Sequence, residues 1–328
     1  MASTAYSIAL VTRRLYFCLL IGAAALTAGC GLNGGIIRDE LRQQSGGVAY
    51  ELTDTPFYSQ TTDQCGPSAL ATVLNGAGVT VTPDQLAPSV YIPDRNGSLQ
   101  FELLAATRGY GRVPYPVPPD VLALLAEIQA GRPVLVLQNL GLGFAPVWHY
   151  AVVVGYLPSE NRFVLRSGEH KRHLVSTSRF LRTWRRAESW GIVVLPPGDL
   201  PADNDATAFV RAVASLESVG QFEAAAAAYL AAVARWPDHV FAWLGLGNSY
   251  YALGQLDDAG AAYTELLGFR PENVVALNNL SMVLADDGRI DDAMRTINRA
   301  LSLTGNSGAK YELVSRTRTE LQRLRISD

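Results

Sequence analysis

Cysteine is scarce in this chain: among 328 residues it occurs only at positions 18, 30 and 65. An excess of positive charge is also lacking, because the formal net charge is −3. This charge gives no indication of a general nucleic-acid binder, which would need an extended basic surface. Hydrophobic residues make up 48% of the chain, as in ordinary globular proteins. The length suffices for a sizeable core and for two domains.

The N-terminus has the pattern of an export signal. Arg13 and Arg14 precede the apolar run LYFCLLIGAAAL, which is shorter than the roughly 20 residues of a membrane span. The letters TAGC then end at Cys30 and resemble the lipobox of bacterial lipoproteins, although Thr27 stands where leucine is usual. An ordinary signal peptide or a single membrane span is the alternative.

The lipoprotein resemblance implies that residues 1–29 are a signal peptide, that Cys30 is lipidated and that residues 30–54 form a lipidated tether. Gly31 follows the cysteine, whereas lipoproteins kept at the inner membrane usually carry aspartate there. The resemblance therefore implies an outer-membrane lipoprotein that faces the periplasm.

Cys65 is then the one thiol left in the mature protein, since cleavage removes Cys18 and lipidation occupies Cys30. In the oxidising periplasm a single cysteine cannot be half of an internal disulfide. Cysteine metal sites normally use several ligands. Two interpretations stay open, namely a buried inert thiol and a reactive one.

Residues 55–195 have the pattern of one α+β domain, with helices first and strands later. Helices are expected from Cys65 to about residue 78 and over 98–111, 118–133 and 178–188. Strands are expected over 133–140, 149–157, 162–168 and 190–196. The polar, proline-rich residues 196–205 are predicted to be a linker.

Beyond this linker the sequence repeats itself. Gly220, Gly254 and Gly288 recur every 34 residues, which is the tetratricopeptide period. We expect three tetratricopeptide repeats over 206–305 and a capping helix over 306–328, together an all-α solenoid. Such a repeat domain would receive a protein partner or substrate in its groove.

Cys65 is predicted at a helix N-terminus, where the helix dipole favours the thiolate form. A nucleophilic thiol also needs a base, for which histidine is the usual residue. His149 opens an apolar strand, whereas His170 and His173 lie in a charged segment predicted to be a solvated turn, and His239 lies in the repeats. A lone strand histidine is more often a core residue, but the helix-start cysteine favours the catalytic interpretation here.

Three motifs carry a family resemblance: Gln60, the letters CGP from Cys65, and HYAVVVGY from His149. Over residues 55–195 the chain resembles the bacteriocin-processing, double-glycine-type cysteine peptidases of the papain-like clan. The resemblance implies that Cys65 is the nucleophile, that His149 is the general base and that Gln60 helps to form the oxyanion hole. It implies neither a cofactor nor a metal.

The third catalytic position departs from the family pattern. The family usually has aspartate or asparagine at the end of the strand after the histidine strand, and here Ser167 stands there. A serine oxygen can orient the imidazole by a hydrogen bond but adds no charge. Glu169 and Asn139 are alternative orienting residues, and Gln64 is a second possible oxyanion donor.

The sequence therefore predicts a lipid-anchored periplasmic cysteine peptidase whose repeat domain recruits a protein partner or substrate. Its expected contacts are a polypeptide substrate, a protein on the repeat groove and the membrane through the lipid on Cys30, with no nucleic acid. Two alternatives stay open. One is a catalytically degenerate envelope scaffold, and the other is an amidase or transpeptidase that acts on peptidoglycan peptides.

Overall fold

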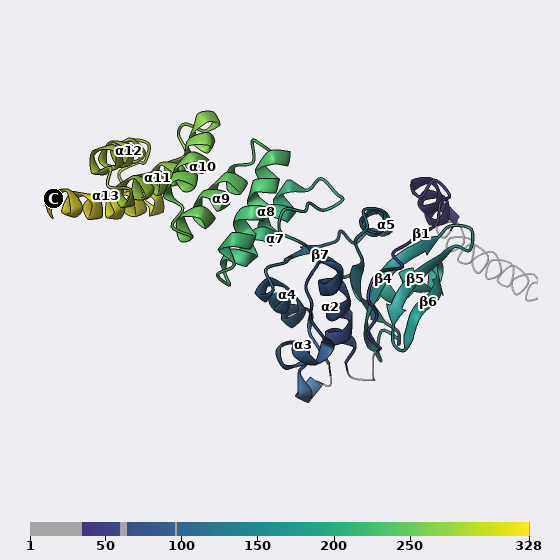
Figure 1. Ribbon diagram of the computed structural model, residues 1–328. Coiled ribbons are helices and arrows are strands. Elements are labelled where there is room, and N and C mark those ends of the chain that lie inside the picture. Colours follow the sequence, from purple (N-terminus) through teal and green to yellow (C-terminus); the bar gives the residue numbers. More distant parts are fainter. Residues whose placement is uncertain (1–34, 60–63, 96, 328) are drawn as a thin grey trace, which may run out of the picture.

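The protein consists of a sheet domain followed by a row of helices that extends away from it, with the C-terminus at the far end (Figure 1). The computed structural model describes residues 35–59, 64–95 and 97–327. Within these residues no helix combines the length and the hydrophobicity needed to cross a bilayer.

One seven-stranded antiparallel sheet organises the first domain. Its strand order is β2-β7-β3-β4-β5-β6, and β1 pairs with β4 as well. The central strands form where β-branched and apolar residues follow one another, because such side chains pack well on a pleated sheet. The strands are β1 (Tyr50–Glu51), β2 (Val113–Pro116), β3 (Val134–Asn139), β4 (Trp148–Leu157), β5 (Arg162–Ser167), β6 (His170–Ser176) and β7 (Gly191–Leu195).

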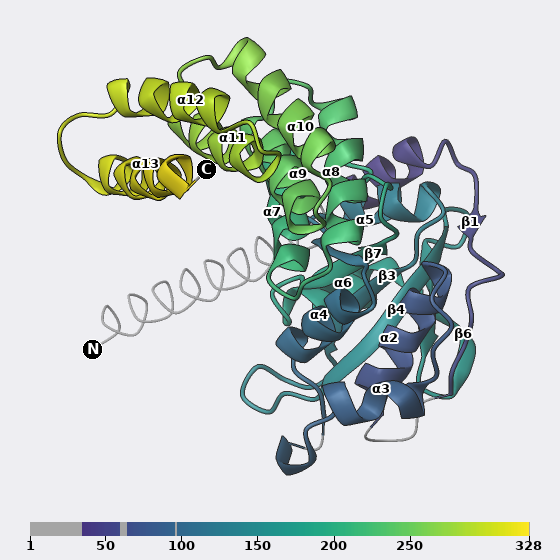
Figure 2. The ribbon, with the colours of Figure 1, turned by 60° about the vertical axis from the view of Figure 1, so that its left-hand side comes forward.

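Helices cover both faces of this sheet. The helices of the domain are α2 (Cys65–Gly76), α3 (Pro83–Val90), α4 (Gln100–Gly109), α5 (Val121–Gln129) and α6 (Thr177–Arg185). Side chains alternate along β4, so Val152 and Val154 pack with α2 on one face, where Figure 2 shows that helix against the strand. Ala151 and Val153 pack on the other face, in the same cluster as Trp184 of α6.

Helix α2 begins at Cys65 because its first turn accepts Pro67, whose fixed φ suits that position. The helix ends at Gly76, and Gly78 then takes a left-handed φ of +78° that favours glycine. Its middle turns are fully buried against the sheet. The cysteine thus lies at the exposed end of a helix that is otherwise part of the core.

The predicted tether over 30–54 is wrong from residue 35 onward. Residues 35–44 are helical, and Leu41 is fully buried in the core of the sheet domain. Gln44 Nε2 donates a hydrogen bond to the carbonyl oxygen of Leu122 at 2.8 Å. The physical reason is a short apolar stripe, because Ile37 and Leu41 are four residues apart and share one helix face. Residues 30–34, with Cys30, lie outside the described residues.

The solvated turn predicted around His170 and His173 is also wrong. These residues belong to β6, which forms a hairpin with β5. The reversal lies just before them, at Gly168, whose φ is +59°. His170 is exposed and His173 half-buried, so the strand has one solvated face, which explains its charged sequence.

The segment 196–205 that joins the two domains is held against the sheet domain. The backbone N–H of Ala202 donates to the buried Glu127 carboxylate at 2.7 Å. The Tyr115 hydroxyl donates to the Asp203 carboxylate at 2.8 Å. Since Phe209 of the first repeat packs in the same apolar cluster as Tyr115, the two domains share one continuous core.

Three helix pairs and a final helix follow, as the 34-residue period predicts. Gly245 and Gly247 face the rings of Tyr229 and Tyr263 of neighbouring helices, so closely that a Cβ atom on either glycine would overlap the ring. The helices are α7 (Ala206–Glu217), α8 (Phe222–Arg235), α9 (Val240–Ala252), α10 (Leu256–Phe269), α11 (Val274–Asp286), α12 (Ile290–Ser302) and α13 (Ala309–Ser327).

Candidate active site

Cys65 is the first residue of α2, and its side chain is half-buried. It packs on the α2 face of the sheet together with Tyr58 and Trp190. Burial raises the pKa of Tyr150, and the charge of an ionised Cys65 raises it further, so the phenol stays protonated beside the thiol. The thiol therefore has an aromatic environment on the side of the sheet.

The first turn of α2 lies so close to the segment before α4 that only glycine fits at position 66. A Cβ atom on Gly66 would lie 2.3 Å from Ser98 Oγ. The Tyr150 hydroxyl donates to the carbonyl oxygen of Ser98 at 3.3 Å. Ser98 Oγ and Glu102 Oε2 are buried without a hydrogen-bond partner among the described residues. Of these two residues, Ser98 lies directly against the first turn of α2.

His149 and Ser167 form the other part of the candidate site. His149 is the second residue of β4 and Ser167 is the last of the antiparallel strand β5, so both lie at the same end of the sheet. His149 Nε2 lies 2.8 Å from Ser167 Oγ, which leaves Nδ1 for another partner. Burial lowers the pKa of His149, and the charge of His173 on β6 lowers it further. The imidazole is therefore held in the neutral, proton-accepting form.

The alternative orienting residues have other positions. Asn139 Oδ1 accepts the backbone N–H groups of Gly141 and Val147 at 3.0 Å each, so this amide shapes the loop before β4. Glu169 is exposed on the turn between β5 and β6. Gln64 is the N-cap of α2 and makes no side-chain capping bond. Gln60, the predicted oxyanion donor, lies outside the described residues.

The structure brings Ser167 to His149 but shows no hydrogen bond between Cys65 Sγ and His149, both of which lie in the described part of the chain. Alternation along β4 directs Tyr150 toward α2 and His149 toward the face of Ala151. Cys65 thus packs on the α2 face, whereas alternation assigns His149 to the opposite face at the same end of the sheet. The chemistry of the pair depends on how closely they approach there.

A cavity of about 360 Å³ lies beside this end of the sheet. Trp148 and Trp190 contribute to its wall, and Trp190 also meets Tyr150 edge-on, with 6.0 Å between ring centroids. In the loop before β4 the side chain of Phe144 is 87% exposed. The sequence placed His173 in a solvated turn, whereas it lies on β6 and acts on the pKa of His149. The letters HKRHLVS do not alternate between polar and apolar residues, so the sequence offers no clear signal for this strand.

The antiparallel sheet, the helix that begins with a cysteine and the paired helices define a peptidase-like domain joined to helical repeats. Residues 52–191 match the Peptidase_C39 like family, and residues 214–274 and 248–308 match the tetratricopeptide repeat. The chain thus carries a C39-like peptidase domain followed by tetratricopeptide repeats. The predicted fold class, a papain-like α+β domain before an all-α solenoid, is confirmed at this level.

Solved structures resemble each part separately. A C39-like peptidase from Bacillus anthracis is 18% identical, with a TM-score of 0.38, and the match covers 45% of this chain and 98% of that one. The type III secretion chaperone SycD of Yersinia enterocolitica, in complex with a peptide of the translocator YopD, is 20% identical with a TM-score of 0.35. That match covers 36% of this chain and 91% of SycD. No curated protein matches this chain.

Proposed function

We propose that this protein is a cysteine peptidase in which Cys65 attacks a peptide carbonyl and His149 accepts the thiol proton. The contact that carries the proposal is the one between His149 Nε2 and Ser167 Oγ, at the end of the sheet where α2 begins. It fixes the imidazole plane and directs the free Nδ1 away from Ser167. Acyl transfer requires a base that is held in one orientation and can reach the nucleophile.

The lowered pKa of His149 favours the neutral imidazole, which is the form that can act as a base. A neutral imidazole can accept the thiol proton as Cys65 attacks. The negative charge that develops on the carbonyl oxygen is then stabilised by the backbone N–H of Cys65 and by Gln60. Water releases the acyl group. The step requires Sγ and Nδ1 to approach when substrate binds, and catalytic hydrogen bonds often tighten only in the substrate complex.

The cavity beside Trp148 and Trp190 supports a polypeptide substrate with an apolar side chain near the cleaved bond. Its wall also contains Leu137 and Val117, while Arg186 and Glu188 supply polar groups. An extended peptide that fills this cavity would pass the half-exposed ring of Trp148, the residue directly before His149. Binding energy gained there would help to orient the scissile carbonyl.

We further propose that the repeats recruit a protein partner or the substrate itself. Tetratricopeptide repeats generally mediate contacts between proteins, and the SycD match has a bound peptide of its translocator. A cavity of about 410 Å³ lies between α7, α9 and α11, and its wall includes Arg211, Asn248 and Phe241, the last of which is 68% exposed. These side chains offer both polar and apolar contacts to a polypeptide.

The location that we propose is the periplasmic face of the outer membrane, with a lipid on Cys30. Its support is the sequence alone, namely the basic and apolar N-terminal segment, the letters TAGC and Gly31. Incorporation of an alkyne-labelled fatty acid into the wild type, and its loss in Cys30→Ser, would test this. Labelling that persists in the variant would contradict it.

Hydrolysis is tested with a library of peptides derived from a bacterial proteome, incubated with the full-length protein in detergent. Cleaved products are identified by mass spectrometry. The wild type is expected to generate new termini, and Cys65→Ala is expected to generate none. Products with an apolar residue beside the cut would support the role of the cavity, and identical products from both proteins would contradict the peptidase.

A second function is favoured by one observation, which is the hydroxyl of Ser167 in place of a carboxylate. A neutral partner does not stabilise an imidazolium, so the domain would be a slow enzyme or an inactive scaffold that binds proteins through its repeats. The absence of cleavage by the wild type in the same library, together with partner capture that depends on Phe241, would favour the scaffold.

A further inference from the structure

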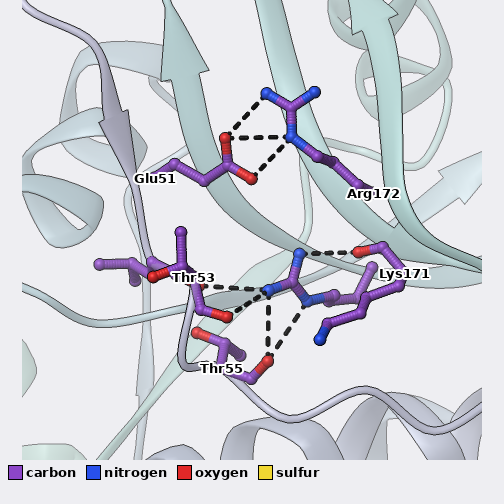
Figure 3. A network of polar contacts seen from close by, with 7 residues as sticks. Glu51, Thr53, Thr55, Lys171 and Arg172 are labelled. Atoms are coloured by element: carbon purple, nitrogen blue, oxygen red, sulfur yellow. Dashed lines mark hydrogen bonds and ion pairs between the residues drawn. The ribbon is translucent and has the colours of Figure 1, made fainter.

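A single buried arginine connects the strand that ends in Ser167 with the segment that leads to Cys65. Arg166 lies on β5 directly before Ser167 and is 3% exposed. Figure 3 shows the polar network around the labelled Thr53, Thr55 and Lys171, with the ion pair of Glu51 and Arg172 beside it. Arg166 donates to the carbonyl oxygens of Leu52 at 3.3 Å, Thr53 at 3.2 Å, Thr55 at 3.2 Å and Lys171 at 2.7 Å.

None of these four acceptors is a carboxylate. The nearby Glu51 instead makes a two-pronged ion pair with the exposed side chain of Arg172, at 2.9 Å. Burial lowers the pKa of Arg166, while the charge of Glu51 acts in the opposite direction. Burying a cation without a direct counter-ion is costly unless its N–H groups are satisfied. A guanidinium meets that need with its planar set of donors, which a lysine ammonium cannot reproduce.

The bonds to these four acceptors extend in two directions. The bond to Lys171 closes the turn between β5 and β6, and this turn begins directly after Ser167. The other bonds hold residues 52–55, which lead along the chain toward Cys65. Alternation directs Arg166 and Ser167 to opposite faces of β5, so the arginine acts on the site through the backbone.

We propose that Arg166 is a positioning residue of the active site. Its guanidinium fixes the turn after Ser167 and the segment 52–55 relative to each other, and thereby sets how closely His149 and Cys65 approach. This inference rests on the proposed Cys65–His149 chemistry. A shift of about 1 Å in a reacting group can cost roughly 100-fold in rate, so such a clamp has a measurable effect.

The test is the rate of Cys65 alkylation by iodoacetamide as a function of pH, in the full-length protein in detergent, with the modified peptide quantified by mass spectrometry. The variants are Arg166→Met and Arg166→Lys, and the matched control is Arg172→Met, which removes the exposed arginine of the same network. Circular dichroism establishes the temperature range in which each variant stays folded, and all rates are compared within it.

At about pH 6.5, near the ordinary histidine pKa, Arg166→Met is expected to react roughly 10- to 100-fold more slowly than the wild type. Its rate should rise only toward the free-thiol pKa of about 8.5. Arg166→Lys should give an intermediate profile, because it retains the charge but fewer bonds, and Arg172→Met should match the wild type. If Arg166→Met does not fold, the test relies on Arg166→Lys.

Wild-type rates and pH profiles in the folded Arg166 variants would overturn the proposal, because a residue that only stabilises the fold leaves thiol reactivity unchanged. The failure of the proposed function has a different signature. If the proposed function is wrong, His149→Ala would show the same pH dependence of Cys65 alkylation as the wild type. Both proposals would then be contradicted.

Discussion

The two domains maintain their structure by different means. In the repeats, glycines of α9 lie against tyrosine rings of the neighbouring helices, and each contact joins elements that are close in sequence. In the peptidase domain, single polar side chains connect segments more than a hundred residues apart, as Arg166 does with Thr55. Steric fit between neighbours suffices for a repeat, whereas a site assembled from distant segments needs directional bonds.

The largest effect is expected where steric fit is broken in the repeats. Gly247→Val would place a Cβ atom 2.5 Å from the ring of the buried Tyr263, so the free energy of unfolding should fall by about 3 kcal/mol or more. The control is Gly268→Ala, since nothing lies within 4 Å of that position, and it should stabilise α10 by about 0.5–1 kcal/mol. Urea unfolding followed by circular dichroism measures both. Equal stabilities would contradict the steric account.

The segment 196–205 that joins the domains should be held less firmly when Glu127 is replaced. Glu127→Ala removes the acceptor of the Ala202 N–H and the partner of Arg132, so we expect a loss of about 1–3 kcal/mol. Limited proteolysis should then cut the variant within residues 196–205 faster than the wild type. The exposed Glu223→Ala is the control. An unchanged cleavage rate would show that the segment is held by other contacts.

Substitutions of Ser167 test whether this residue orients His149. Ser167→Ala should slow Cys65 alkylation by about tenfold, or about 1.4 kcal/mol, because His149 loses its orienting partner. This is far below the roughly 10⁴-fold cost of altering a triad carboxylate. Ser167→Asp adds a charge that favours imidazolium, so the pKa of His149 should rise and the alkylation profile should move to higher pH. A profile that is unchanged in both variants would contradict the pairing.

The smallest expected effect is the dependence of the folding stability on pH. Burial lowers the pKa of His149 in the folded state, so below its ordinary value of about 6.5 the unfolded chain binds the proton more readily. Stability should therefore be complete above that pH and fall as the pH drops below it. His149→Gln should flatten this dependence, and the exposed His170→Gln should not. Thermal melts across this pH range would show the difference.

The fold could be predicted where the sequence is periodic. The 34-residue spacing of Gly220, Gly254 and Gly288 predicts the helix pairs, and the apolar runs predict the central strands. The helix over residues 35–44 and strand β6 could not be predicted as easily, because each exposes a charged face. Their contacts, such as Gln44 with Leu122, depend on segments that only folding brings together.

The candidate site likewise contains some residues that the sequence predicts and others that it does not. The helix-start Cys65, the strand-start His149 and Ser167 could be selected from motif and position. Arg166 could not, since its role comes from carbonyl groups of residues 52–55, and carbonyl groups have no signature in a sequence. The neighbourhood of His149 and His173 likewise depends on strand pairing that the charged segment conceals.

The pairing of Cys65 with His149 is tested most directly by the pH dependence of Cys65 alkylation by iodoacetamide in the wild type and in His149→Ala. If the two residues form a catalytic pair, the wild-type rate should reach its plateau well below the free-thiol pKa of about 8.5. His149→Ala should then react as a free cysteine. Profiles that follow a free thiol in both proteins, or an unreactive Cys65, would contradict the cysteine peptidase and favour a scaffold that acts through its repeats.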